Sequence, residues 1–137
     1  TGIVEIKRYV AVTDVGNTIN PTQVEGQVRG GIVQALGQVF LENINYDLAS
    51  GQLLSGSYMD YAMPKARDIC FIETFSNPTV TEVNPLGVKG AGEIGTGCAV
   101  ATFVNALVDA LSPLNIHHID TPATAEIIWQ AIRSAKV

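Results

Sequence analysis

The chain has 137 residues, of which 47% are hydrophobic and only 15% are charged. An average soluble domain carries roughly 25% charged residues, and disordered chains are richer still in charge, so this composition excludes intrinsic disorder. We expect a single domain over residues 1–137, with part of its surface facing another protein segment. The net charge of −5, with scattered Lys and Arg, argues against a nucleic-acid or anionic-membrane surface.

Three sequence features indicate the cellular compartment of the protein: its cysteines, its apolar runs and its N-terminus. Cys70 and Cys98 form no CxxC pair, which predicts reduced core thiols rather than a disulfide or a metal site. No uncharged apolar run approaches the ~20 residues that span a bilayer, so we expect no membrane insertion. The chain opens on Thr1-Gly2-Ile3 without a signal-peptide pattern. These features predict a cytoplasmic fragment of a larger protein.

The N-terminal third predicts a strand followed by a long helix. Residues 3–13 are rich in β-branched and aromatic side chains, which is typical of a strand. After a turn at 14–17, the pair Asn20-Pro21 is typical of a helix start. Apolar residues then recur at helical spacing over 22–42, which predicts a helix there.

Four glycines interrupt this predicted helix: Gly26, Gly30, Gly31 and Gly37. Each interior glycine costs a helix ~1 kcal/mol relative to alanine, so four of them need a compensating reason. Glycine lets a second backbone or a ligand come closer than any side chain permits. We therefore expect a close approach to this helix.

The rest of the chain predicts several shorter elements: a hairpin over 45–56, a strand over 68–75, a second helix over 100–111 that is ended by Pro113, and a short strand at 116–119. A final helix is predicted over 123–135, with Thr121 as its N-cap and Pro122 at its first position. The loop 76–97 is long and glycine-rich, and long loops in compact domains are usually functional or disordered. The element order predicts an α+β fold with mixed sheet strands and three main helices.

The segment NPLGVKGAGEIGTG, residues 84–97, places Lys89 and Glu93 in a glycine-rich loop that opens a helix. Gly90 and Gly92 would let backbone N–H groups reach a ligand, and the helix N-terminus favours a nearby anion. A carboxylate held rigid and ionised in such a loop has what a general base needs. Spacing alone leaves three interpretations open: ordinary helix entry, an anion cradle, or a catalytic loop.

Other polar and aromatic residues are weaker candidates. His117 and His118 are adjacent, so on a strand they would point to opposite faces and could not chelate one metal ion. We expect a structural role for both. Tyr58, Tyr61 and Trp129 are more typical of packing than of a substrate cage.

Three segments together resemble the C-terminal part of the molybdenum-binding large subunit of the xanthine dehydrogenase and aldehyde oxidoreductase family. They are VEGQVRGGIVQALGQ (24–38), SYMDYAMP (57–64) and NPLGVKGAGE (84–93), and the tail at 111–132 is similar as well. The resemblance covers essentially the whole chain and is closest to the aerobic carbon monoxide dehydrogenase large-chain branch.

The resemblance implies a role for each matching position. Glu93 would be the active-site base beside the molybdenum, and Gln27 would contact a molybdopterin dinucleotide of the cytosine form. The positions that would line the metal-side edge of that cofactor are Lys89, Gly90, Ala91 and Gly92. The pterin dithiolene holds the metal in this family, so no residue of this chain is expected to be a metal ligand.

The resemblance also implies an oligomeric complex with the remainder of the large subunit, an iron–sulfur subunit and a flavin (FAD) subunit. The substrate would be carbon monoxide, an aldehyde or an N-heterocycle, oxidised with water-derived oxygen. We expect the isolated 137-residue chain to be inactive. Two alternatives are a non-catalytic module that binds a phosphate or nucleotide through the glycine loop, and a structural assembly domain.

Overall fold

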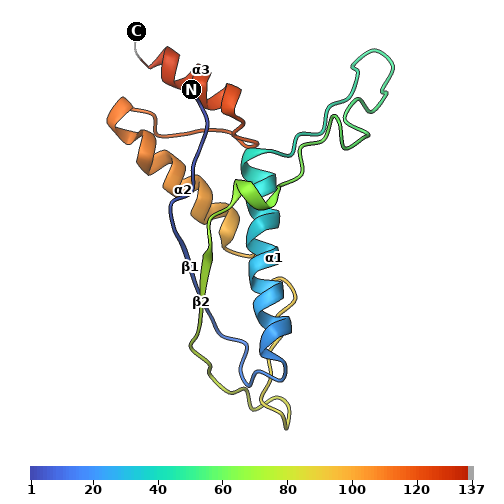
Figure 1. The fold of residues 1–137 in the computed structure, drawn as a ribbon, viewed down its shortest axis with the longest axis vertical. Helices are drawn as coiled ribbons and strands as arrows, with labels where there is room; N and C mark the ends of the chain where they lie inside the picture. Colours follow the sequence, from blue (N-terminus) through green and yellow to red (C-terminus); the bar gives the residue numbers. More distant parts are fainter. Residues whose placement is uncertain (136–137) are drawn as a thin grey trace.

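The computed structural model describes residues 1–135. Three helices and a small sheet make up the fold (Figure 1): β1 (Tyr9–Thr13), α1 (Pro21–Phe40), β2 (Ile72–Ser76), α2 (Ala99–Leu111) and α3 (Ala125–Ser134). Two single-turn 3-10 helices, η1 (Ala66–Asp68) and η2 (Ser112–Leu114), precede β2 and follow α2. The α+β prediction is therefore confirmed.

β1 and β2 form a two-stranded parallel sheet in which Tyr9 lies opposite Ile72 and Thr13 opposite Ser76. The predicted strand over 3–13 is only half formed, since residues 1–8 have no strand partner among the described residues. A strand needs a neighbour to pair its backbone groups, and β2 begins only opposite Tyr9. The strand predicted over 68–75 likewise starts later, because residues 66–68 form η1.

α1 forms where the sequence predicts it. Asn20 is the N-cap, with its side-chain oxygen accepting a hydrogen bond from the Gln23 N–H at 3.1 Å, and Pro21 occupies the first position. One face of the helix is buried, through Val28, Ile32, Ala35, Leu36 and Val39. This face packs against α2 and β2 and forms the centre of the molecule.

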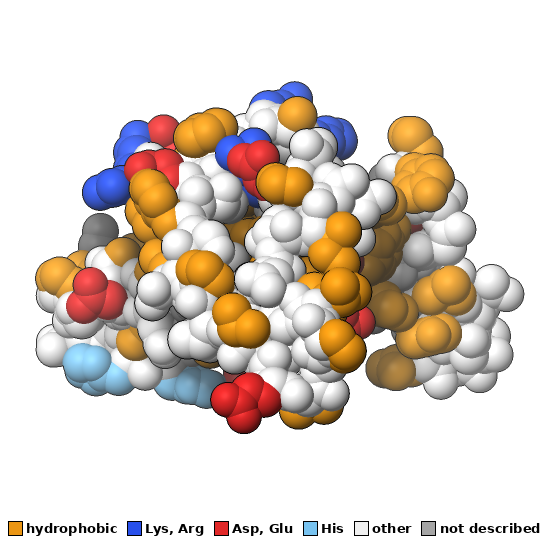
Figure 2. Space-filling view, turned by 90° about the horizontal axis from the view of Figure 1, so that it is seen from below, with side chains coloured by type: hydrophobic (Ala, Val, Ile, Leu, Met, Phe, Trp, Pro, Cys, Tyr) orange, Lys and Arg blue, Asp and Glu red, His pale blue; other side chains and the backbone are white. Residues whose placement is uncertain are grey.

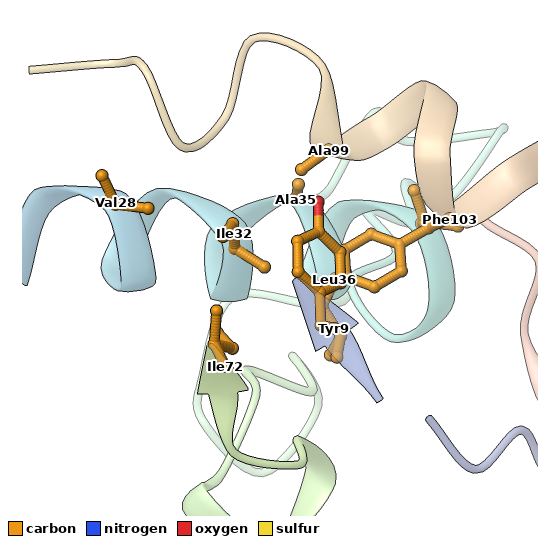
Figure 3. Close-up of a cluster of buried hydrophobic side chains, with 9 residues drawn as sticks. Tyr9, Val28, Ile32, Ala35, Leu36, Ile72, Ala99 and Phe103 are labelled. Carbon is orange, nitrogen blue, oxygen red and sulfur yellow. The ribbon is translucent and has the colours of Figure 1, made fainter. Parts of the chain in front are cut away.

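The main core lies between α1, the sheet and the start of α2 (Figure 3). Tyr9 from β1 and Phe103 from α2 meet with ring centroids 5.2 Å apart, and Phe103 also meets Phe40 at 5.7 Å. Such pairs stabilise a core beyond the area they bury. Ala99, fully buried at the first turn of α2, lies on the α1 side of this cluster. The core thus fixes the point at which the glycine-rich loop enters α2.

A second cluster joins the end of α2 to α3: Leu107, Leu111, Ile116, Ile119, Ala123 and Ile128. Residues 116–119 are not a strand, contrary to the prediction, because no strand lies beside them within residues 1–135. His117 and His118 are both exposed, and His118 Nε2 lies 3.0 Å from Asp120 Oδ1. The N-cap of α3 is Thr124, three residues after the predicted cap.

Residues 42–64 form an arm that projects from the end of α1 (Figure 1). The predicted hairpin is present at its tip, where Tyr46 pairs with Leu53 in an antiparallel bridge. Tyr58 is 85% exposed, so it does not pack as predicted, whereas the Tyr61 hydroxyl donates to Glu42 Oε2 at 2.7 Å. Hydrophobic side chains spread over this arm (Figure 2), consistent with the expectation that part of the surface faces another protein segment.

Two of the four α1 glycines are needed for packing within the chain. A Cβ on Gly31 would lie 2.8 Å from the Thr96 backbone nitrogen, and one on Gly37 would lie 2.6 Å from the Pro64 ring. At Gly26 and Gly30, no atom of residues 1–135 beyond the adjoining backbone of α1 lies within 4 Å of such a Cβ. The close approach predicted from the sequence is therefore confirmed within the chain at Gly31 and Gly37, and not at Gly26 and Gly30.

Gly95 is the counterpart of these glycines on the glycine-rich loop, because its Cβ would lie 2.1 Å from the Val28 carbonyl oxygen. We expect Gly95→Ala to lower the free energy of unfolding by about 1–3 kcal/mol, the usual cost of overpacking. Gly97→Ala is the matched control, since its Cβ would meet only the Glu93 carbonyl oxygen at 3.7 Å. Denaturant unfolding of both variants measures the difference, and equal stability would contradict this tight contact.

Candidate functional site

An open cavity of about 700 Å³ lies between the N-terminal turn of α1 and the glycine-rich loop. It brings together four of the residues singled out from the sequence: Gln27, Lys89, Ala91 and Gly92. Gln27 comes from the exposed side of α1, while the other three follow one another along the loop. Gly26 lines the same cavity, and nothing in the chain occupies the space where its side chain would be.

The lining of the cavity is mixed: apolar side chains come from Val15, Ile19, Val24, Val88 and Ala91, and its charged side chain is Lys89. Amide side chains come from Asn17, Asn20, Gln23 and Gln27. The first turn of α1 also faces the cavity, and a helix N-terminus carries partial positive charge. This arrangement suits a phosphate-bearing ligand, because amide donors and a helix N-terminus bind anions without a buried charge.

Backbone N–H groups on the loop are available to such a ligand. Among residues 1–135, the N–H groups of Gly90, Ala91 and Gly92 have no hydrogen-bond partner. A Cβ at Gly90 or Gly92 would meet no other atom within 4 Å, so the backbone here is open to its surroundings. Three successive free donors in an open segment are compatible with the anion cradle considered from the sequence.

Glu93 is placed at the end of this open segment, with its side chain exposed. Its backbone carbonyl accepts hydrogen bonds from the N–H groups of Thr96 and Gly97, both at 3.1 Å, which begins the turn that leads into α2. The backbone of Glu93 is thus held by the turn while its carboxylate stays free. It follows Gly92, which lines the cavity, but does not itself line it.

The ammonium group of Lys89 is engaged with the protein. Lys89 Nζ lies 2.6 Å from Asp14 Oδ2 and 2.6 Å from Thr79 Oγ1. Asp14 also accepts hydrogen bonds from the Thr79 hydroxyl and from the N–H groups of Thr79 and Gly16. These partners, Lys89 first and Thr79 second, hold the pKa of Asp14 well below its usual range, so the Asp14 carboxyl is ionised at neutral pH.

Asp14 and Thr79 are the residues that sequence reasoning missed. Asp14 was interpreted only as part of a turn, and Thr79 only as part of a long loop. Their partner Lys89 is 75 residues from Asp14, so no local pattern predicts the contact. Asn17 and Gln23 were missed for a related reason, because they border the cavity only once α1 and the loop come together.

The remaining candidates lie outside the cavity. Cys70 is half-buried beside the core, but Cys98 is exposed at the N-cap of α2, so the prediction of a core thiol is wrong there. Trp129 is partly exposed under the Arg133 guanidinium. Within the described part of the chain, no three His, Cys, Asp or Glu side chains are grouped to hold a metal ion, and no helix is long and apolar enough to cross a membrane.

Comparison with known proteins identifies a family for this architecture. Residues 1–70 match the model of the molybdopterin cofactor-binding domain. The chain is 41% identical to the large subunit of nicotine 6-hydroxylase from Paenarthrobacter nicotinovorans, over 97% of this chain and 16% of the relative. It is 37% identical to the carbon monoxide dehydrogenase large chain of Afipia carboxidovorans, over 95% of this chain and 16% of the relative.

Solved structures agree with the sequence comparison. The fold superposes on Cu,Mo-CO dehydrogenase with a TM-score of 0.92 and 35% identity, over 99% of this chain and 17% of that one. Quinoline 2-oxidoreductase from Pseudomonas putida gives a TM-score of 0.85 and 42% identity, over 90% of this chain and 16% of that one. The chain therefore spans about one sixth of the length of the relatives it matches.

Proposed function

The chain belongs to the family of molybdopterin cofactor-binding domains, and from that premise we propose that it forms part of the large subunit of a molybdenum-dependent hydroxylase or dehydrogenase. In this proposal it supplies the active-site base and part of the site for a molybdopterin dinucleotide of the cytosine form. The observation that supports it most is the cavity, which brings Gln27 from α1 to the same space as Lys89, Ala91 and Gly92 from the loop.

The residues around the cavity fit a bulky, phosphate-bearing cofactor. Gly26 leaves room where any other side chain would project, and the free N–H groups of residues 90–92 can donate to phosphate or pterin oxygens. The Gln27 amide can donate and accept along the same wall. When bound, the molybdenum cofactor supplies the redox chemistry of the oxidation.

Two features of Glu93 support its proposed role as the base. Its carboxylate has no hydrogen-bond partner among residues 1–135, and its backbone is fixed by the turn into α2. A free, positioned carboxylate can take a proton at Oε1 or Oε2 from a water-derived nucleophile, and this raises the reactivity of the nucleophile toward an electrophilic carbon. Gln27 and the loop amides would orient the cofactor relative to this base.

The substrate and partners extend the same proposal. Carbon monoxide, an aldehyde or an N-heterocycle would be oxidised, and electrons would leave through an iron–sulfur subunit and a flavin subunit. Relatives bearing on these classes include carbon monoxide dehydrogenase, nicotine 6-hydroxylase and the gamma subunit of a 6-hydroxypseudooxynicotine dehydrogenase complex. The remainder of the large subunit would supply the other cofactor contacts.

Elemental analysis of the natively purified protein that carries this chain tests the proposal. We expect stoichiometric molybdenum, and copper alongside it would favour carbon monoxide as the substrate. The isolated 137-residue chain is the comparison, and we expect it to hold little molybdenum and to show no turnover. Absence of molybdenum from the native protein, under conditions that load a control molybdoenzyme, would instead favour a phosphate-binding module.

A further inference from the structure

We propose that Asp14 is a positioning residue that fixes the glycine-rich loop, and through it the carboxylate of Glu93. Asp14 lies in the turn that follows β1, whereas the glycine-rich loop lies between β2 and α2. The contact between them gives Lys89 a role different from the one expected from the sequence. The inference rests on the proposed function only in naming Glu93 as the group that is positioned.

The Asp14 carboxylate is saturated by hydrogen bonds from two directions. Oδ1 accepts from the Gly16 N–H at 2.9 Å, within its own turn, and from the Thr79 N–H at 3.0 Å, across the molecule. Oδ2 accepts from Lys89 Nζ at 2.6 Å and from the Thr79 hydroxyl. Charge-assisted hydrogen bonds of this kind are about twice as strong as neutral ones. Asp14 therefore joins the turn to two points of the loop.

Backbone contacts make this junction continuous. The Lys89 N–H donates to the Val15 carbonyl at 2.9 Å, and the Asn17 N–H donates to the Gly87 carbonyl at 3.0 Å. Gly16 and Val88 pair in an antiparallel bridge between these two bonds. Gly16 cannot carry a side chain here, because a Cβ would lie 2.2 Å from the Gly87 carbonyl oxygen. The loop is thus pinned at Lys89 through both its side chain and its backbone.

The other end of the open segment is pinned to α1. Thr96 Oγ1 donates to the Gly31 carbonyl at 3.2 Å, and Gly95 lies directly against the Val28 backbone. Only residues 90–94 lie between the two anchors, and this segment carries Glu93. Because five residues leave little slack, release of either anchor should allow the base to move. The Asp14 side chain adds its contacts to the backbone hydrogen bonds of the Lys89 anchor, and a single substitution can remove these side-chain contacts.

The same geometry gives Lys89 its role. Its ammonium group has two oxygen partners at 2.6 Å, Asp14 Oδ2 and Thr79 Oγ1, both supplied by the protein. Lys89 therefore acts as a strut between the loop and Asp14, and anion binding at the cavity falls to backbone N–H groups. Lys89 also lines the cavity.

Hydrogen exchange and kinetics on the natively purified protein test the proposal through Asp14→Asn. The amides of Asn17 and Lys89, both hydrogen-bonded across the junction, should exchange at least about tenfold faster, while peptides from the buried part of α1 keep wild-type rates. Turnover should fall by about 10- to 100-fold in kcat, with KM within about threefold, because a misplaced base slows the reaction without altering binding.

Two further variants separate positioning from general stability. Thr79→Val removes the hydroxyl and should reproduce the effects of Asp14→Asn, whereas Thr79→Ser keeps the hydroxyl and should restore wild-type exchange and kcat. Glu73→Gln is the matched control, because Glu73 forms an ion pair with Arg8 on the sheet and does not contact the loop. It should leave both readouts unchanged.

The experiments distinguish failure of the role proposed for Asp14 from failure of the proposed molybdenum-dependent function. Unchanged exchange at Asn17 and Lys89 in Asp14→Asn would overturn the anchoring role, and faster exchange with an unchanged kcat would overturn the positioning of Glu93. A wild-type protein without molybdenum or turnover would contradict the proposed function, yet the exchange data would still report whether Asp14 holds the loop.

Discussion

Replacement of Glu93 by Gln is expected to lower turnover by about 10²- to 10⁴-fold, the usual contribution of a positioned general base. The amide has nearly the size of the carboxylate but cannot accept a proton at neutral pH. The side chain of Glu93 is exposed and makes no hydrogen bond among residues 1–135, so its loss should leave folding intact. Steady-state kinetics, together with molybdenum content per subunit, measures the change.

The matched control is Glu82→Gln, the same substitution on the same loop. Glu82 is exposed and lies before the Lys89 anchor, away from the segment that carries Glu93. It should retain wild-type turnover. If Glu93→Gln kept full activity with normal molybdenum, Glu93 would be an ordinary loop residue. If it lost molybdenum as well as activity, its role would be in cofactor binding rather than proton transfer.

Helix α1 shows how much of the fold could be predicted. Its start was predicted from Asn20 and Pro21, because capping is a local hydrogen bond that the sequence encodes within three residues. Its buried face was predicted from the spacing of apolar residues. The glycines indicated a close approach, and Gly31 and Gly37 confirm it inside the chain. Local rules were sufficient for these features.

Features that depend on distant neighbours were predicted less well. Residues 3–8 and 116–119 have the composition of strands, but a strand forms only where another is present to pair with it. The start of α3 was misplaced because both Thr121-Pro122 and Thr124 can cap a helix. The Ala123 N–H donates to the Val39 carbonyl of α1, and a local sequence pattern does not predict such a tertiary hydrogen bond.

The candidate site divides in the same way. Lys89, Ala91 and Gly92, which line the cavity, were singled out because they belong to one short motif whose resemblance to a family is visible in the sequence; the role of Glu93 in the same motif stays a prediction. Asp14 and Thr79 were not found, since each becomes part of the site only through a contact made by the fold. The resemblance placed Lys89 at the cofactor, whereas the structure also shows its ammonium group committed to Asp14.

Substitution of Gly26 by Leu is the second change with a large expected effect. It should lower the molybdenum content of the protein without lowering the free energy of unfolding. Gly26 lies in α1 with no atom of the chain near its missing side chain, and leucine is a better helix former by about 0.8–1 kcal/mol. The free energy of unfolding should therefore rise or stay constant. The new side chain would project into the cavity, and molybdenum content should fall at least about tenfold, since a tightly fitting cofactor cannot share that space.

Gly30→Leu is the control that makes this result specific to the cavity. Gly30 lies one turn further along α1 and is equally free of neighbouring atoms, but it does not line the cavity. It should gain the same helix stability and keep its molybdenum. Equal loss of molybdenum in both variants would show that the cofactor contacts a longer stretch of α1. Normal molybdenum in Gly26→Leu would mean that the space beside Gln27 is filled by something other than the cofactor, and the assignment of this cavity would be wrong.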